Sequence, residues 1–161
     1  MNIINKLKEF SNTHDMENVG LLMTDELIEE WYDSSPLNCV AFATTGGDGV
    51  HFSVFNGIDI DKSPVIMTVP MNFGEENMVI ARTLYDFLCL GSRFGFFYLE
   101  QLSYNFDTTT QKIEASNLVE PPNSELRELT EIFSLEPIRE VSEYIKKTNS
   151  EYFNQLELAD A

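Results

Sequence analysis

Residues 40–55, with the sequence VAFATTGGDGVHFSVF, predict a β-hairpin and decide the fold of this chain. Three glycines and an aspartate occupy positions 46–49 between two apolar runs, and they supply the positive φ angles that a tight turn needs. With a four-residue turn, Thr45 faces Val50 and the rest of the register follows. The predicted pairs are Ala43 with Phe52 and Ala41 with Val54 on one face, and Phe42 with Ser53 and Thr44 with His51 on the other.

A third strand is predicted over residues 64–69, which are apolar apart from Thr68 and are bounded by prolines. Helical spacing of apolar residues predicts most of the remaining elements. These are helices over 2–12, 24–33, 75–90, 94–102, 126–133 and 137–152, together with a short hairpin whose strands are 104–107 and 112–115. Because strands and helices do not alternate, this order favours an α+β fold with a central, mainly antiparallel sheet and flanking helices.

The predicted helix over 24–33 separates apolar from acidic residues. Thr24 is typical of an N-cap, and acidic residues follow it in the first turn. The apolar face consists of Leu27, Ile28, Trp31 and Tyr32, and the opposite face carries Glu26, Glu29, Glu30 and Asp33. Trp31 and Tyr32 are either core residues on the inner face or aromatic anchors for a partner, and the sequence leaves both interpretations open.

The length of 161 residues predicts a single domain, 1–161, large enough to bury a core. No apolar run is long enough to span a bilayer, and Lys6, Lys8 and Glu9 interrupt the N-terminal apolar residues, so no secretory signal is expected. Cys39 and Cys89 both lie in apolar runs and are predicted to be buried, reduced thiols. We therefore expect a cytoplasmic protein that does not associate with membranes.

The formal net charge of −17 is the extreme feature of the composition. It argues against binding to nucleic-acid backbones, which requires clustered lysine and arginine. From Glu9 to Asp61 the chain contains eleven acidic residues and no lysine or arginine. Such a distribution either keeps the protein soluble or attracts a basic protein partner, and it would speed the encounter with that partner at low salt.

Residues with catalytic or metal-binding potential do not form a convincing site in the sequence. In the predicted register Cys39 and His51 point to opposite faces of the hairpin, which argues against a catalytic dyad. The glycine-rich turn at 46–49 leads into a strand and has no lysine or arginine nearby, so a hairpin turn is favoured over a phosphate site. Asp59 and Asp61 begin a calcium-like pattern that Pro64 interrupts. We expect no catalytic residue, no metal and no cofactor.

Six acidic residues between positions 26 and 61 are the candidate binding site. The residues predicted to contact a partner are Glu26, Glu29, Glu30, Asp33, Asp59 and Asp61. The partner expected from their charge is a basic protein.

Three segments of the chain resemble the SUKH superfamily of bacterial and eukaryotic domains. They are the hairpin at 40–55, the apolar strand Pro64 to Pro70, and the Tyr85-Asp-Phe-Leu88 step of the following helix. The resemblance implies a SUKH-like α+β fold. Because bacterial members commonly act as immunity proteins that neutralise toxins, often nucleases, it also implies this function. The family shares no catalytic residue that is transferable to this chain.

The sequence therefore predicts a non-enzymatic binding protein, similar to an immunity protein, that neutralises a basic toxin by direct binding. The alternative is a small-molecule-binding or regulatory domain. Its pocket would lie near the hairpin turn and the aromatic residues of Phe94 to Tyr98. An enzyme ranks third.

Overall fold

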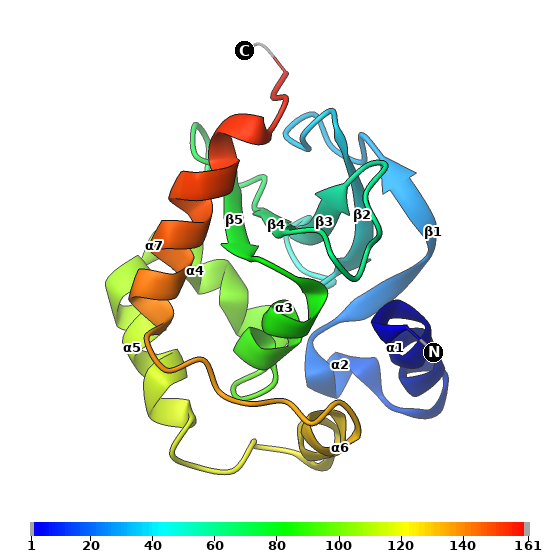
Figure 1. Cartoon of the computed structure of the whole chain (residues 1–161), viewed down its shortest axis with the longest axis vertical. Coiled ribbons are helices and arrows are strands. Elements are labelled where there is room, and N and C mark those ends of the chain that lie inside the picture. The colour runs from blue at the N-terminus through cyan, green and yellow to red at the C-terminus, as the bar shows by residue number, and fades with distance from the viewer. Residues whose placement is uncertain (1, 160–161) are drawn as a thin grey trace.

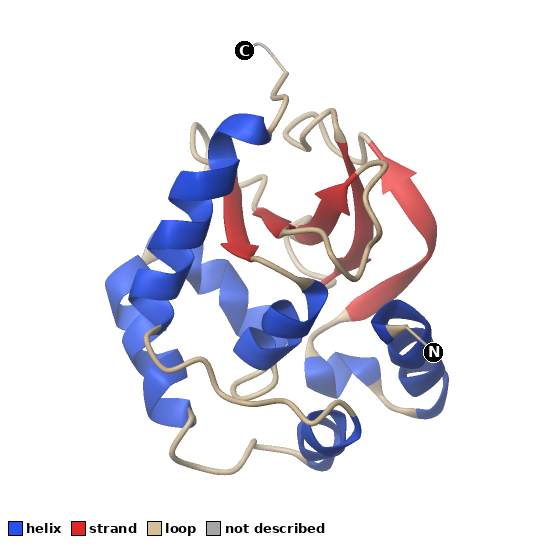
Figure 2. Cartoon of the chain, viewed as in Figure 1, coloured by secondary structure: helices blue, strands red, loops and turns tan. Residues whose placement is uncertain are grey.

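One antiparallel sheet forms the centre of the molecule. In the computed structural model, which describes residues 2–159, the strands follow one another across the sheet in chain order (Figure 1). They are β1 (Leu22–Glu29), β2 (Cys39–Thr44), β3 (His51–Phe55), β4 (Val65–Thr68) and β5 (Asn77–Ala81). Helices flank this sheet, which confirms the predicted α+β fold (Figure 2).

Helices pack at both edges of the sheet. They are α1 (Ile3–Thr13), α2 (Met16–Val19), α3 (Leu84–Gly91), α4 (Gln101–Tyr104), α5 (Phe106–Ser116), α6 (Ser124–Ile132) and α7 (Val141–Tyr152), with short 3₁₀ turns η1 (Phe96–Glu100) and η2 (Phe153–Gln155). α7 runs beside β5, whereas α1 contacts β1 at the opposite edge (Figure 1). Across residues 2–159, no helix has both the length and the apolar character needed to cross a membrane.

Both faces of the sheet are buried, but the main core lies on the side of α3. Phe87 of α3 packs against Phe52 of β3, with ring centroids 4.8 Å apart, and against Phe96 of η1 at 5.1 Å. All three side chains are 0% exposed. The opposite face has a smaller cluster of Cys39, Phe55, Ile66 and Val79, covered by Tyr152 and Leu156.

The hairpin register is confirmed next to the turn and is wrong further along. Thr44 pairs with His51 and Ala43 with Phe52, as predicted, but Ala41 pairs with Ser53 because a bulge falls at Phe42. The predicted pairs Ala41 with Val54 and Phe42 with Ser53 are therefore not formed. A bulge allows successive residues to point to the same side, and here both Phe42 and Ala43 belong to the α3-side core.

The predicted helix over 24–33 is wrong, since residues 24–29 belong to the edge strand β1 and residues 30–33 to the connection that follows it. Met23 pairs with Ala43 and Ile28 with Ala41, so five steps along β1 match two steps along β2. The extra residues bulge out of the ladder and interrupt the alternation of a regular strand. Because the alternation is interrupted, the apolar residues of this segment have a spacing that is typical of a helix, although the backbone is extended.

Other elements also differ from prediction, and the helix predicted over 94–102 is instead the 3₁₀ turn η1 followed by α4. The segment predicted as one helix over 75–90 divides into β5 and α3, and Thr83 caps α3 by accepting a hydrogen bond from the Asp86 amide at 3.2 Å. The hairpin predicted over 104–115 is instead the helix α5. Two of its threonine hydroxyls bond to backbone carbonyls of the preceding turn, with Thr109 donating to Asn105 at 2.7 Å and Thr110 to Asp107 at 3.1 Å.

Candidate functional site

The predicted partner-binding residues occupy two separate parts of the structure. Glu26 and Glu29 are exposed on the edge strand β1, and Glu30 and Asp33 follow in the connection to β2. Asp59 and Asp61 lie in the loop between β3 and β4. Of these two parts, the connection after β1, which carries Glu30 and Asp33, lines a cavity.

Asp61 has a structural role at the start of α1. Its carboxylate accepts hydrogen bonds from the amides of Ile3 at 2.8 Å and Ile4 at 3.2 Å. These are among the amides that a helix leaves without partners at its N-terminus. The Asp59 carboxylate accepts in turn from the Asp61 amide at 3.1 Å. This loop is therefore organised around α1, and we place the candidate site at Glu30 and Asp33.

A groove of about 880 Å³ opens beside Glu30 and Asp33. Its walls are the connection 30–37, the β4–β5 loop and the C-terminal segment after α7. Four carboxylates line it, those of Glu30, Asp33, Glu75 and Glu76, and no lysine or arginine is among the described lining residues. The lining also includes three exposed apolar side chains, which are Leu37 at 46%, Phe73 at 82% and Leu158 at 42% exposure.

A row of polar side chains on the sheet holds the first wall of the groove in place. The Thr68 hydroxyl donates to Asn77 Oδ1 at 2.6 Å, and Asn77 Nδ2 donates to the Ser34 carbonyl at 2.9 Å. Beside them, His51 Nε2 lies 2.8 Å from the Ser35 hydroxyl. Because these side chains are fixed by the strands, the wall formed by 30–37 is positioned before any ligand arrives.

His51 is the centre of an aromatic cluster under this wall. Its ring contacts those of Trp31 and Tyr32, with centroid distances of 5.5 and 5.3 Å, and its Nδ1 is 2.8 Å from the Gly49 carbonyl. Burial lowers the pKa of His51 below its usual value, and the bond to Gly49 opposes this shift. A neutral imidazole with the proton on Nδ1 satisfies both contacts. Trp31 and Tyr32 thus pack against the sheet, while Tyr32 keeps 39% exposure at the groove.

The C-terminal wall is tied to the start of β2. The Leu37 amide donates to the Glu157 carbonyl at 2.7 Å, and the Glu157 amide donates to Asn38 Oδ1 at 3.0 Å. Asn38 Nδ2 also donates to the Gln155 carbonyl at 2.9 Å. Segments far apart in the sequence therefore form adjacent walls.

Cys39 and His51 do not form a dyad, although the reason differs from the one predicted. The bulge at Phe42 places Cys39 opposite Phe55, on the same face as His51. The two residues are instead separated along the strand by about 13 Å, at 3.3 Å per residue. Both ring nitrogens of His51 contact other partners, and burial raises the pKa of the Cys39 thiol to about 12. Both cysteines are buried and free, as predicted.

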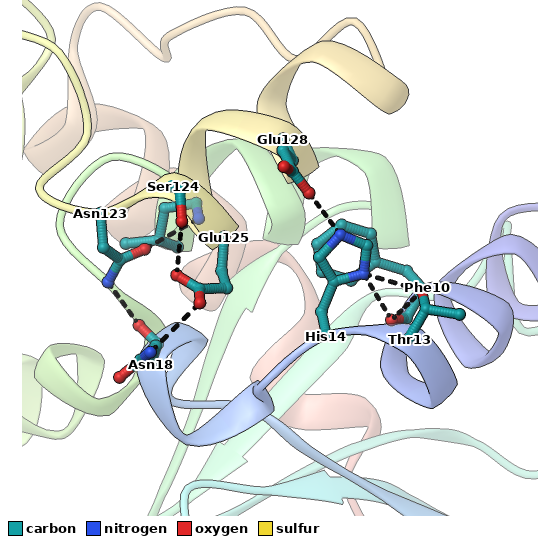
Figure 3. A network of polar contacts seen from close by, with 9 residues as sticks. Phe10, Thr13, His14, Asn18, Asn123, Ser124, Glu125 and Glu128 are labelled. Carbon is teal, nitrogen blue, oxygen red and sulfur yellow. Dashed lines mark hydrogen bonds and ion pairs between the residues drawn. The ribbon is translucent and has the colours of Figure 1, made fainter.

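The second histidine, His14, joins two helical segments (Figure 3). It stacks on Phe10 at 3.7 Å and contacts the Glu128 carboxylate of α6. Nearby, Asn18 donates to Glu125 at 3.2 Å, and Asn123 donates to the Asn18 carbonyl at 2.8 Å. These contacts dock α1 and α2 on α6, so we interpret them as structural.

A smaller cavity of about 250 Å³ lies beside Phe97 and Tyr98, within the aromatic segment predicted for the alternative function, but no residue of the hairpin turn is among its described lining residues. Its volume is below the range of about 300–1,000 Å³ that is usual for small-molecule sites. Among the side chains of residues 2–159, no group of three or more histidine, cysteine, aspartate or glutamate residues is placed to hold a metal ion.

Comparison of the chain with family models, with curated proteins and with solved structures finds no match in any of the three.

Two walls of the groove were not predicted from the sequence, namely the β4–β5 loop and the C-terminal segment after α7. Phe73, Glu75 and Glu76 lie in the β4–β5 loop, whereas Glu75 and Glu76 were predicted to begin a helix. The sequence feature that could have indicated a loop here is Gly74, which directly precedes Glu75 and Glu76. In the structure its φ is 90°, a value that favours glycine.

Proposed function

We propose that this protein is a non-enzymatic binding protein that recognises a basic protein partner through the groove. The observation that carries the proposal is the composition of the lining, in which four carboxylates accompany exposed apolar side chains without a compensating cation. A partner segment that combines lysine or arginine with apolar residues is complementary to both features.

The charge of the whole chain supports attraction of such a partner. A net charge of −17 on 161 residues produces a negative field, and a field of this sign raises the association rate of a basic protein. Glu26 and Glu29 extend the acidic surface along β1 towards the groove residue Glu30. Charges at the rim act mainly on association rate and specificity, so other groups must supply much of the affinity.

The exposed apolar side chains are suited to supply that affinity. Phe73 is 82% exposed, and it shares the groove with Leu37 and Leu158. Burying about 100 Å² of apolar surface contributes roughly 2.5 kcal/mol before the costs of association. We therefore expect Phe73 to be the main apolar anchor of the interface.

The resemblance to the SUKH superfamily extends this proposal to an immunity protein that neutralises a toxin, possibly a nuclease. Nuclease domains bind phosphate backbones through basic surfaces, so an acidic protein is a suitable competitor for such a surface. Co-expression with a toxin domain encoded next to this chain tests this part. Protection of the host cells is expected, and persistent killing despite soluble expression of both proteins would contradict it.

The groove itself is tested by binding of a fluorescein-labelled peptide in which lysine alternates with leucine. The test variant neutralises three lining residues, Glu30→Gln, Asp33→Asn and Glu75→Gln. At roughly 0.5 kcal/mol for each exposed charge, the Kd measured by fluorescence anisotropy should rise about tenfold.

A matched control separates the groove from the general charge of the protein. Glu9→Gln, Glu120→Gln and Glu143→Gln remove the same number of exposed charges at other places. The control should change the Kd by less than about twofold. Equal weakening by the two triple variants would mean that the peptide senses only net charge, and the groove would lose its assigned role.

A small-molecule-binding or regulatory domain is the second candidate, because a cavity exists beside Phe97 and Tyr98. The two functions differ in the residues that they require. Substitution of Phe97 would affect a ligand of that cavity, and Phe97 is not among the lining residues of the groove.

A further inference from the structure

Glu100 has a buried carboxylate oxygen without a hydrogen-bond partner. The residue is 7% exposed, and its Oε2 is one of two buried side-chain oxygens in the described part of the chain that lack a partner. The ion pairs within residues 2–159 join His14 to Glu128 and Arg82 to Glu151, so neither includes Glu100. A buried carboxylate without a partner is costly in the isolated protein.

A second carboxylate increases this cost. Asp48, in the turn between β2 and β3, is near enough that its charge acts together with burial, which is the larger cause, to raise the pKa of Glu100. The charges of Glu100 and Asp48 also contribute to the raised pKa of Tyr104, for which burial is again the main cause. Asp48 and Tyr104 therefore lie near enough to Glu100 for their charges to act on one another, where the hairpin turn packs against η1.

The backbone around Glu100 is held by close packing. A Cβ atom placed on Gly20 would lie 2.5 Å from the Phe97 amide nitrogen, and one placed on Gly91 would lie 2.2 Å from the Phe96 ring. Only glycine fits at such distances. The backbone of η1 is consequently fixed against these glycines, and Glu100 lies at its end.

Exposed aromatic rings border the same place. Phe97 is 55% exposed, and its ring would be 2.9 Å from a Cβ atom on Gly47, which places it against the hairpin turn. Tyr104 is 48% exposed and lies on the other side of Glu100 in the chain. Aromatic faces beside a carboxylate attract a cation that is weakly hydrated and planar.

We infer that Glu100 and Asp48 form a recognition site for a single arginine side chain of the basic partner, bordered by Phe97 and Tyr104. A guanidinium group supplies several donors to carboxylates and stacks on aromatic rings, whereas an ammonium group is a more strongly hydrated point charge. A calcium ion requires six or more oxygen ligands, and no metal-binding group of three or more such residues is present in residues 2–159. The chemistry of the site therefore favours guanidinium.

The inference rests on the proposed function only in taking the arginine from a basic protein partner. The first experiment therefore uses a small arginine analogue in place of that partner. Argininamide is titrated into the protein while the carboxyl ¹³C resonance of Glu100 is followed by NMR. We expect a saturable shift in the millimolar range, with lysinamide binding at least threefold more weakly. Absence of saturation, equal binding of lysinamide, or saturation by calcium chloride instead would overturn the assignment.

Two variants connect the site to these residues. Asp48→Asn retains the exposed turn and should weaken argininamide severalfold, as read from the same Glu100 resonance. Glu100→Gln should abolish saturable binding, measured by calorimetry, and should stabilise the protein at pH 7 because it removes a buried charge. A destabilised Glu100→Gln protein, or one that binds argininamide normally, would contradict the proposal, and Glu131→Gln is the matched exposed control.

The lysine–leucine peptide then separates this site from the groove. Arginine replaces lysine in a second version of the peptide, and both versions are measured with wild-type protein and with Glu100→Gln. Loss of the arginine preference in Glu100→Gln supports the site. If neutralising the groove weakens both peptides while Glu100→Gln changes neither, the groove keeps its role and the arginine site is rejected.

Discussion

The two faces of the sheet are both buried, but they are held together in different ways. On the α3 side, Phe52, Phe87 and Phe96 pack against one another in an apolar core. On the other side, His51 and Asn77 bind the connection 30–37 through hydrogen bonds. The first face accounts for stability, and the second positions the walls of the acidic groove. Substitutions on the two faces should therefore have different consequences.

The largest effect is expected from Phe87→Ala on the α3 side. Phe87 is 0% exposed and contacts Phe42, Phe52 and Phe96, so its removal leaves a cavity in the main core. The free energy of unfolding, measured by urea denaturation, should fall by about 3–5 kcal/mol. The fraction that remains folded should bind the lysine–leucine peptide normally, and a loss below about 1 kcal/mol would contradict the assigned core.

A smaller effect is expected from Ala43→Leu, which adds volume to the same face. Ala43 is fully buried and pairs with Phe52. Overpacking should lower the free energy of unfolding by roughly 1–3 kcal/mol. A change near zero in the same titration would show that the space opposite Phe52 is larger than the structure indicates.

On the groove side, His51 should make stability depend on pH. Burial lowers its pKa in the folded protein below the unfolded value of about 6.5, so the unfolded chain binds more protons. Its contribution is therefore complete above about pH 6.5 and is lost as the pH falls. The thermal midpoint of wild type should decrease between pH 7 and pH 5 more steeply than that of His51→Gln, and equal slopes would mean that His51 is solvated.

The smallest effect on stability is expected from reversing Glu26, Glu29 and Glu30 to lysine. These side chains are exposed at the edge of the sheet and in the following turn, where single charges contribute little. The free energy of unfolding should change by less than about 0.5 kcal/mol. A larger loss would show that these residues support the fold of β1 rather than a binding surface.

The central part of the fold was predictable because its signals are local. The turn at 46–49 determines the pairing of Thr44 with His51 and of Ala43 with Phe52. The errors in the predicted strand register arise where contacts between residues far apart in the sequence determine the pairing. The bulges at Phe42 and between Met23 and Ile28 shift the register, and their cause is the fit of side chains into a core that no local pattern contains.

The candidate site was predictable in its charge and not in its shape. Glu30 and Asp33 were identified from an acidic stretch without lysine or arginine, and they line the groove. Glu75 and Glu76 join them only because antiparallel pairing brings the β4–β5 loop beside the 30–37 connection. Asp61 was identified by charge alone, and its hydrogen bonds to α1 depend on a contact that spans 58 residues.

The most direct test of the account is the association rate of the lysine–leucine peptide as a function of ionic strength. It is measured by stopped-flow fluorescence for wild type, for the groove variant Glu30→Gln, Asp33→Asn, Glu75→Gln, and for the control Glu9→Gln, Glu120→Gln, Glu143→Gln. We expect the groove variant alone to associate several times more slowly at low salt, and we expect the difference to disappear at high salt as screening removes the attraction. Equal rates for all three proteins at low salt would contradict this expectation and would leave the acidic surface as a means of solubility.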